Sequence, residues 1–238
     1  MSLRFHLAAK LPAMPLCSDM DTIPTGPPRI RLISVALACW AGFVLVAWWQ
    51  ASGASADFDR AGLLMWRQGP MLQPIGPGWL SDAFDTVTQL GGGRFRTALG
   101  LLALVLLFAC GHRYESLLLA AILLPAAAIN SVLKLIFARP RPDLAPYLAD
   151  FGGFSFPSGH SFNGAATYIG LALILVRLAP NHRIAMLAMA TALSLAIAFS
   201  RVWLGVHYPT DAIAGWLGGA GWALVVASLP NGRTGSNG

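Results

Sequence analysis

The chain has 238 residues, of which 56% are hydrophobic and only 11% are charged. A soluble globular domain carries about 25% charged residues, so this composition excludes an ordinary soluble protein. The mean hydropathy is +0.62 and the apolar residues come in long blocks, which together predict a membrane protein of one domain. The net charge of +6 does not indicate nucleic-acid binding, because no basic run with interleaved aromatic residues occurs.

The first 31 residues contain five prolines and show no sustained periodicity, so we expect a mobile cytoplasmic tail there. Six apolar runs follow, and each is a candidate transmembrane helix: Leu32–Trp49, Thr97–Gly111, Ser116–Phe137, Phe162–Val176, Ile184–Phe199 and Ala212–Leu229. Several have fewer than about 18 residues, so their ends must recruit flanking polar residues to cross a bilayer. The runs predict an all-α fold, with one domain over residues 32–229 that forms a compact bundle of six transmembrane helices. A short mobile tail is expected over residues 230–238.

Residues 51–93 form a mixed segment between the first two runs. Apolar residues such as Phe58 and Leu63 beside acidic ones such as Asp59 predict a short amphipathic helix on the membrane surface. The glycines and prolines of residues 69–78 predict a loop. A second short helix is expected to begin at Ser81, as N-cap, and to end at the glycines of residues 91–93. We expect this outer segment to lie over the functional site and to determine selectivity.

The lysine and arginine residues carry limited information on orientation. With six spans and the N-terminus inside, each side of the membrane holds eight of them. If Lys134, Arg141 and Arg201 are set aside as site residues, the inside leads by eight to five, which favours cytoplasmic termini. In either orientation the polar residues near positions 134–142, 157–160 and 200–211 lie on one side, because two spans separate the second group from the third.

Three polar segments at span ends carry the residue types of an anion site: Lys134–Pro142, Pro157–His160 and Ser200–Asp211. Arginine can contact an oxyanion through two donors, and histidine can act as a nucleophile or a base. A Ser-Gly turn that enters a helix offers free backbone N–H groups to an anion. Intramembrane ionisable residues of this kind indicate function by default.

Each segment taken alone also has a structural explanation. Lys134 and Arg141 fit an ordinary basic span end, and Ser158 fits a helix cap that precedes an interfacial histidine, His160. Asp211 fits an N-cap of the last helix. Together, however, the segments place three cations, two histidines, a carboxylate and a helix N-terminus on one side of the membrane. That combination predicts a site for a multiply charged anion, most naturally phosphate.

The segments resemble the three-part signature of the type 2 phosphatidic acid phosphatase superfamily, K-x6-R-P, P-S-G-H and S-R-x5-H-x3-D. Every fixed position has its counterpart in order: Lys134, Arg141, Pro142, Pro157 to His160, Ser200, Arg201, His207 and Asp211. Six spans are also what the membrane branch of this family would have, so the resemblance covers residues 32–229. Arg139 falls outside the signature spacing and is a candidate auxiliary phosphate contact.

The resemblance implies how a phosphate would be bound. Lys134, Arg141 and Arg201 would hold the phosphoryl oxygens, and the Ser158 hydroxyl and the backbone amides near Gly159 would join them. These cations neutralise the phosphate by themselves, and no cluster of acidic residues is available to hold magnesium. We therefore expect no metal and no cofactor.

The resemblance also implies the chemistry. His207 would attack phosphorus to give a phosphohistidine, and Asp211 would fix the tautomer of the ring. His160 would protonate the leaving oxygen and then activate water. Both histidines start from an ordinary pKa of about 6.5, so a bell-shaped pH profile on the acid-to-neutral side is expected.

A site at the mouth of a helix bundle suits a lipid phosphate whose tail remains in the bilayer. Candidate substrates are undecaprenyl pyrophosphate, phosphatidic acid, phosphatidylglycerol phosphate and a lipid A phosphate, and the sequence does not rank them. We expect a bacterial inner membrane with the site on the periplasmic side; the oligomeric state is not indicated. A phosphotransferase would use the same residues. An anion or lipid transporter has no need for the His-x3-Asp pair, and a haloperoxidase, found among soluble relatives, is disfavoured by the spans.

Overall fold

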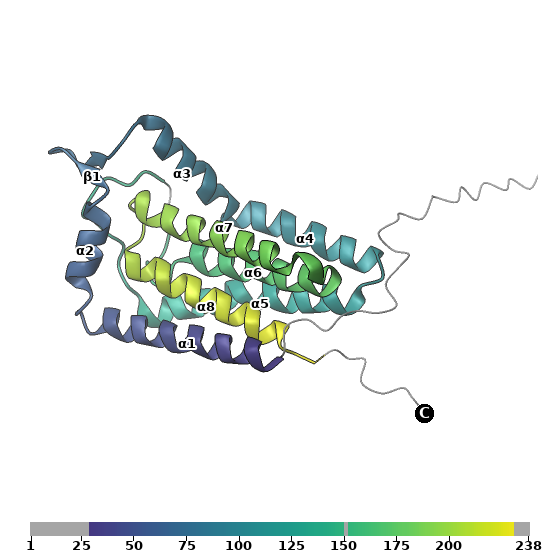
Figure 1. Cartoon of the computed structure of the whole chain (residues 1–238). Coiled ribbons are helices and arrows are strands. Elements are labelled where there is room, and N and C mark those ends of the chain that lie inside the picture. The colour runs from purple at the N-terminus through teal and green to yellow at the C-terminus, as the bar shows by residue number, and fades with distance from the viewer. Residues whose placement is uncertain (1–28, 150–151, 231–238) are drawn as a thin grey trace, which may run out of the picture.

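The structure is a computed structural model that describes residues 29–149 and 152–230, and nearly all of its elements are helices (Figure 1). The elements in chain order are α1 (Arg29–Ala51), α2 (Ala56–Leu64), β1 (Arg67–Gln68), β2 (Gln73–Pro74), α3 (Gly78–Leu90), α4 (Gly93–Ala109), α5 (Arg113–Phe137), α6 (Gly159–Leu178), the 3-10 helix η1 (Pro180–His182), α7 (Arg183–Trp203) and α8 (Pro209–Ala227). The predicted mobile tails lie outside the described residues, except for their inner ends at residues 29–31 and 230.

Among the described residues, five helices are long and apolar enough to cross a membrane: α1, α5, α6, α7 with η1, and α8. The pair α3–α4, bent by 45° at a short break, becomes a sixth when it is counted as one span. Helix α4 alone has only 17 residues. The predicted all-α membrane bundle is therefore confirmed. Its second span, α4, is too short to be counted without α3.

The helices extend past the apolar runs that predicted them. Helix α1 begins at Arg29 rather than at residue 32, α6 begins at Gly159 rather than at residue 162, and α8 begins at Pro209 rather than at residue 212. Hydropathy marks the part of a helix that is buried in lipid, whereas capping and proline determine where the helix begins. Gly159, His160 and Asp211 of the signature consequently lie in the first turns of α6 and α8.

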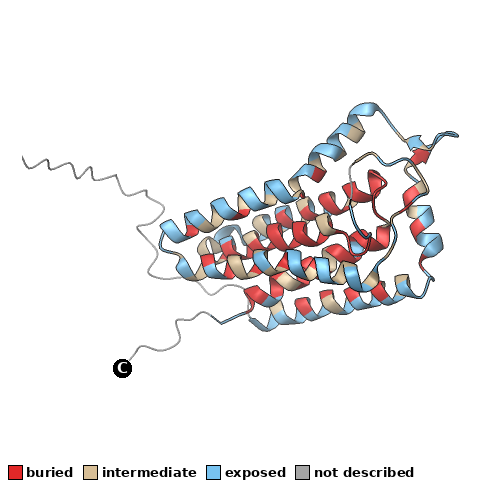
Figure 2. Ribbon diagram, turned by 180° about the vertical axis from the view of Figure 1, so that it is seen from behind, coloured by how far each residue is buried: buried red, intermediate tan, exposed pale blue. Residues whose placement is uncertain are grey.

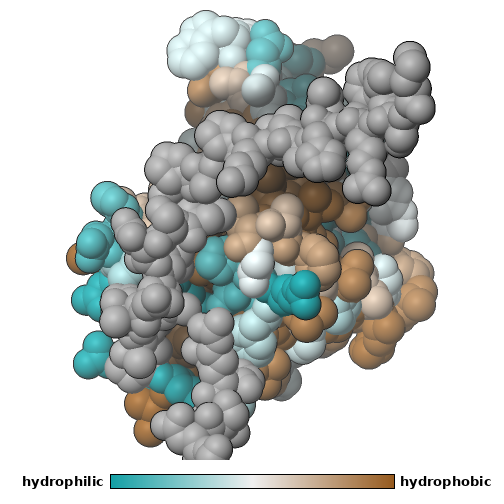
Figure 3. Space-filling view, turned by 90° about the vertical axis from the view of Figure 1, so that its right-hand side faces the viewer, coloured by the Kyte–Doolittle hydropathy of each residue, from teal (hydrophilic) through white to brown (hydrophobic). Residues whose placement is uncertain are grey.

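Helices α6 and α8 form the centre of the bundle, and the other helices surround them (Figure 2). Helix α1 packs along α8, while α5 and α7 pack along α6. The outer helices expose apolar side chains on their outward faces, for example Val44 and Leu45 on α1 and Leu101 and Leu102 on α4. Figure 3 looks onto the end of the bundle opposite α2 and shows hydrophobic flanks beside hydrophilic residues at this end. Such apolar outer faces are suited to contact with lipid.

Close packing of α6 against α8 depends on two glycines. A Cβ at Gly215 would lie 2.6 Å from the carbonyl oxygen of Ser158, and a Cβ at Gly219 would overlap the carbonyl of Phe162. The GxxxG spacing predicts this close approach, because small residues let two backbones come together. The contact fixes the N-terminal turn of α6 relative to that of α8.

The segment between α1 and α4 differs from its sequence-based description in three ways. Helix α2 exists and buries Leu63, but Asp59 is buried as well, at 1% exposed, while Phe58 is 43% exposed. The expected loop over residues 69–78 contains β2, which pairs antiparallel with β1. The predicted N-cap at Ser81 is wrong: α3 begins at Gly78 after Pro77, whose fixed backbone geometry suits a helix entry. The expected end of α3 just before Gly91 is correct.

Candidate active site

The three signature segments meet at the end of the bundle that α2 crosses (Figure 1). The first runs from the last turn of α5 into the loop after it, and α5 ends at Phe137 because Arg139 precedes a proline and cannot easily remain helical. The second forms the N-terminus of α6, and the third connects α7 to α8. Residues more than 70 positions apart in the chain thus come into direct contact.

His207 lies between a cation and a carboxylate. Its Nε2 is 3.1 Å from Nη1 of Arg141, and its Nδ1 is 3.4 Å from Oδ2 of Asp211. A guanidinium can only donate, so Nε2 accepts from Arg141 and the ring proton resides on Nδ1, facing Asp211. The lone pair of Nε2 therefore points at Arg141, one of the cations predicted to contact phosphate.

Asp211 is fully buried and is held on both of its oxygens. Oδ2 accepts from the backbone N–H of Tyr208 at 2.9 Å and from the Ser155 hydroxyl, while Oδ1 accepts from Nη1 of Arg139 at 2.6 Å. Asp211 is the third residue of α8 and not its N-cap, which is Tyr208, and the two residues share a capping box. The orienting role of Asp211 stays a prediction.

The N-terminus of α6 supplies backbone donors. Ser158 is the N-cap, and its oxygen accepts from the backbone N–H of Ser161 at 3.5 Å and from the Ser161 hydroxyl at 3.0 Å. The backbone N–H groups of Gly159 and His160, at the first two helical positions, have no intrahelical acceptor. Because Ser158 is fully buried, the structure favours these amides over the Ser158 hydroxyl as anion donors, and the Ser158 contact stays a prediction.

Lys134 approaches this helix N-terminus from α5. Its Nζ donates to the carbonyl oxygen of Phe154 and, at 3.5 Å, to that of Ser155. A Cβ at Gly159 would lie 3.8 Å from Cε of Lys134. The ammonium group is therefore close to the free amides of α6, as a shared phosphate contact requires.

Arg201 lies in the last turn of α7 and is 3% exposed. Its Nη1 donates to Oγ1 of Thr88 on α3 at 2.7 Å, and its Nε has no hydrogen-bond partner within the described part of the chain. Unpaired buried donors are costly, so an orphaned guanidinium N–H at this place is what an anion site would show. The backbone N–H of His207 donates to the carbonyl of Arg201 at 3.3 Å, which links the two residues directly.

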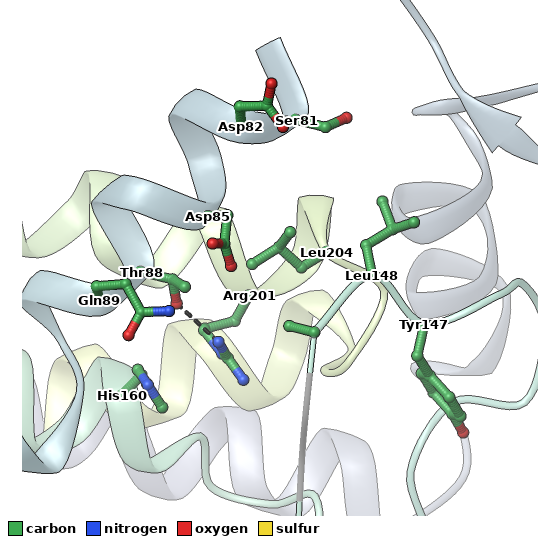
Figure 4. Close-up of a pocket in the computed structure, with 11 residues that line it drawn as sticks. Ser81, Asp82, Asp85, Thr88, Gln89, Tyr147, Leu148, His160, Arg201 and Leu204 are labelled. Carbon is green, nitrogen blue, oxygen red and sulfur yellow. Dashed lines mark hydrogen bonds between the residues drawn. The ribbon is translucent and has the colours of Figure 1, made fainter. Parts of the chain in front are cut away.

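A cavity of about 1030 Å³ opens over His160 and Arg201 (Figure 4). Its opposite wall is α3, and a third side comes from the loop around Tyr147 and Leu148. The lining residues are Ser81, Asp82, Asp85, Thr88, Gln89, Tyr147, Leu148, Ala149, His160, Arg201 and Leu204. The outer segment does lie over the site, as expected. His207, Arg141 and Lys134 are not among the residues that line this cavity.

Burial determines the charge state of His207, which lies in the short connection between α7 and α8. Removal from water lowers the pKa of His207 to about 4, although the nearby Asp211 carboxylate opposes the shift. Burial also lowers the pKa of Arg141 below its ordinary value, with Asp211 again opposing. The imidazole is therefore neutral at neutral pH, as a nucleophile must be.

Arg139 is not positioned like the other cations. Its Nη1 donates to Asp211 and to Oγ1 of Thr210 at 2.8 Å, and its Nη2 donates to Oδ2 of Asp59 at 2.7 Å. Although burial alone would lower it, the carboxylates of Asp211 and Asp59 raise the pKa of Arg139. Both terminal nitrogens are thus engaged by protein oxygens, and the geometry favours support of Asp211 over the auxiliary phosphate contact expected from the sequence.

Sequence reasoning missed several residues that shape the site. Asp59 and Thr88 come from the outer segment, and Arg67 of β1 donates to the carbonyl of Trp203 at 2.7 Å at the end of α7. Gly205 has a φ of +78°, and a Cβ there would lie 2.9 Å from Nη2 of Arg67, so the turn that leads to His207 needs glycine. None of these residues has a spacing signal, because each acts through a partner far away in the chain.

Comparison with known proteins gives consistent relationships. A sequence model of the PAP2 superfamily matches residues 115–234. Phosphatidylglycerophosphatase B of Bacillus subtilis is 34% identical over 146 residues, which cover 58% of this chain and 69% of that protein. A lipid A 1-phosphatase of Rhizobium johnstonii is 36% identical over 108 residues, which cover 42% of this chain and only 41% of the relative.

Two solved structures are also similar. The crystal structure of a transmembrane PAP2 type phosphatidylglycerolphosphate phosphatase from Bacillus subtilis matches with a TM-score of 0.71 at 29% identity, over 80% of this chain and 93% of that one. Aquifex aeolicus LpxE matches with a TM-score of 0.52 at 23% identity, over 63% and 87% of the two chains, which is a likeness of fold alone.

The helical membrane fold and the similarity to phosphatases of membrane lipids together define the class of the protein, a membrane lipid phosphatase. The chain belongs to the PAP2 superfamily, whose model covers half of its length and all three signature segments.

Proposed function

We propose that the protein hydrolyses the phosphate monoester of a membrane lipid through a phosphohistidine on His207, without a metal ion. The observation that supports this most is the double pairing of His207, whose Nε2 faces Arg141 while its Nδ1 faces Asp211. A histidine held this way is neutral, has one defined tautomer and presents its lone pair to an anion site.

Substrate binding uses the cations in their observed places. Lys134 and the free amides at the start of α6 contact one side of the phosphoryl group, while Arg141 and Arg201 contact the others. The Nε–H of Arg201, which has no hydrogen-bond partner in the described part of the protein, then donates to a phosphoryl oxygen. Positioning and charge neutralisation are most of what phosphoryl transfer needs from a protein.

The first chemical step forms a bond between Nε2 of His207 and phosphorus and breaks the bond to the lipid oxygen. The imidazole becomes positively charged, and Asp211 stabilises that charge through Nδ1–H. His160, in the cavity beside Arg201, donates a proton to the leaving lipid alkoxide.

The second step regenerates the enzyme. Neutral His160 takes a proton from water as the water oxygen attacks the phosphohistidine. The bond between phosphorus and Nε2 breaks, its electrons return to the ring nitrogen, and phosphate leaves. His160 lines the cavity, which is where both the leaving lipid oxygen and the attacking water would meet its ring.

The cavity wall bears on the substrate class. Asp82, Asp85 and Gln89 present two carboxylates and an amide across the cavity from Arg201 (Figure 4). Carboxylates accept hydrogen bonds from hydroxyl groups and repel a second phosphate. This favours a monoester whose head group carries hydroxyls, such as phosphatidylglycerol phosphate or a lipid A phosphate, over undecaprenyl pyrophosphate. The similarity to a phosphatidylglycerophosphatase supports the same ranking.

The proposed location is a bacterial inner membrane with cytoplasmic termini and a periplasmic site. It is supported by the relatives, which are bacterial, and by the excess of basic residues on the side of the termini once Lys134, Arg141 and Arg201 are set aside.

Purified protein in detergent is expected to release inorganic phosphate from lipid phosphomonoesters at the same rate with and without EDTA, and to be inhibited by vanadate. A panel with phosphatidylglycerol phosphate, phosphatidic acid, lipid A 1-phosphate and undecaprenyl pyrophosphate is expected to give the lowest kcat/KM for the pyrophosphate. Replacing Asp82 and Asp85 together by asparagine should reduce the difference in kcat/KM between the monoesters and the pyrophosphate.

Asp143→Asn, an exposed position that does not line the cavity, is the matched control for the panel. Loss of all activity in EDTA contradicts the metal-independent mechanism. Transfer of the phosphoryl group to a lipid or sugar, with none released, identifies a phosphotransferase instead.

The acid limb of kcat/KM is expected near pH 4 rather than near 6.5. Attack requires neutral His207, and burial lowers the pKa of this residue to about 4. The neutral form therefore persists as the pH falls from 7 to 5 and is lost only as the pH passes through about 4. Measuring kcat/KM with two lipid phosphates whose second pKa values differ separates ionisation of the enzyme from that of the substrate. A fall in kcat/KM that comes from His207 stays at the same pH with both substrates, whereas one that comes from the phosphate moves. An enzyme limb at 6.5 contradicts the assignment of a buried, neutral nucleophile.

A further inference from the structure

Asp59 is a buried carboxylate that the chemistry above does not use. It belongs to α2, the short helix that crosses the end of the bundle, and its side chain is 1% exposed. It lies outside the signature and outside the residues that the family model matches. A buried charge is retained only where partners compensate it, so its contacts identify what it does.

Both oxygens of Asp59 are fully engaged. Oδ1 accepts from the backbone N–H of Thr210 at 3.0 Å and from the Thr210 hydroxyl at 2.9 Å. Oδ2 accepts from the Ser55 hydroxyl at 3.0 Å and from Nη2 of Arg139 at 2.7 Å. Thr210 immediately precedes Asp211, so α2 is fastened to the first turn of α8 at the residue next to the one that orients His207.

Arg139 connects the two carboxylates. Its Nη2 contacts Asp59 and its Nη1 contacts Oδ1 of Asp211 at 2.6 Å, while the ring of Tyr208 covers the guanidinium at 4.1 Å. Oδ1 of Asp211 is thereby committed to Arg139, and Oδ2 remains on the side of His207. The contacts form one continuous chain from α2 to the imidazole.

We propose that Asp59 and Arg139 are positioning residues that hold Asp211 against His207 and set the negative charge that Asp211 presents to the ring. Two carboxylates share one guanidinium, so the group carries one net negative charge toward the imidazole. That charge balances the imidazolium that forms when His207 attacks phosphorus. The inference rests on the proposed role of His207.

The experiment changes one charge at a time. Asp59→Asn leaves Arg139 paired with Asp211 alone, so the group becomes neutral and stabilises the imidazolium less. We expect kcat to fall roughly 10–100-fold with KM almost unchanged, because Asp59 does not touch the substrate. The acid limb of kcat/KM should move to lower pH, since the His207 imidazole becomes harder to protonate.

Arg139→Gln has the opposite charge effect. It leaves two carboxylates without their cation, so the acid limb should move to higher pH, whereas a merely structural defect would not shift the limb in opposite directions. The double variant restores one net negative charge and should return the limb toward that of the wild type. The other charges that face His207 are unchanged in all variants: Arg141 from the loop after α5, Arg201 from α7 and His160 from α6, with Lys134 of α5 nearby.

Asp57→Asn is the matched control, because Asp57 is an exposed carboxylate on the same helix. Equal kcat values and equal acid limbs for Asp59→Asn and Asp57→Asn, in an active wild-type background, overturn this inference alone. So does a rise in KM with unchanged kcat, which indicates direct substrate contact. If Asp59→Asn does not fold, as judged by thermal melting in detergent, Arg139→Gln tests the inference instead. An acid limb of kcat/KM that does not move to higher pH in Arg139→Gln then overturns it. A wild type that releases no phosphate overturns the proposed function and this inference together.

Discussion

Replacing His207 by glutamine is expected to lower kcat by at least roughly 10⁴-fold, since the loss of a nucleophile removes the covalent route altogether. Glutamine can place an amide nitrogen near the position of Nε2, so it can still contact Arg141 while being unable to attack. Binding of vanadate to the variant should therefore persist although phosphate release is lost. Wild-type protein quenched in alkali after mixing with radiolabelled substrate should carry an acid-labile label, and the variant should carry none.

His182→Gln is the control for this comparison, because His182 is an exposed histidine in η1 between α6 and α7, at the other end of those helices. Its activity and labelling should match those of the wild type. A His207→Gln protein that keeps most of its activity, or that still acquires the label, rules out His207 as the nucleophile. Thermal melting in detergent establishes whether the variant is folded.

His160→Gln is expected to lower kcat roughly 10²–10⁴-fold with lipid phosphates, because the alkoxide then departs without a proton. The size of the loss should depend on the leaving group. Nitrophenyl phosphate releases a stable phenolate that needs no protonation, so formation of the phosphohistidine from it should be nearly normal. Activation of water is still impaired, and the labelled phosphoenzyme should accumulate as a burst.

Both outcomes are needed for the assignment of His160. An equal loss with both substrates and no burst indicates that His160 only contributes to binding or packing. The ring also contacts the break between α3 and α4, where a Cβ at Gly91 would lie 3.2 Å from its Cδ2. Asn163→Ala, which alters a neighbouring α6 side chain that donates to the carbonyl of Gly159, controls for a local disturbance of this helix turn.

The sequence was most informative where the residues that carry a signal lie close together in the chain. Long apolar runs predicted the spans, and the charged residues at their ends predicted the site, because both signals lie within a few turns of one helix. The spacing of His207 and Asp211 across the start of α8 is of this kind. The signature then brought together residues that periodicity alone does not connect, and Arg141 does contact His207.

The outer segment was predicted less well, for a physical reason. A carboxylate such as Asp59 is expected on a solvated helix face, but here it is buried by contacts with Arg139, 80 residues away, and with Thr210. In the sequence Arg139 likewise resembles one more phosphate ligand, and only the structure shows that it contacts Asp59. The start of α3 was misplaced because a serine is a common N-cap, whereas the chain enters that helix from a proline. Partners distant in sequence leave no periodic signal, so tertiary contact decides these cases.

The glycine contact between α6 and α8 has a consequence for the stiffness of the active site. His160 belongs to α6 and Asp211 to α8, and the backbone N–H of Ser158 donates to the carbonyl of Asp211 at 3.0 Å exactly where the two helices begin. The spacing between His160 and Asp211 is therefore set by two helices in backbone contact, while His207 lies in the connection just before α8. We expect changes in bilayer thickness that tilt the outer helices to leave this spacing almost unchanged, because α6 and α8 are in backbone contact at the centre of the bundle.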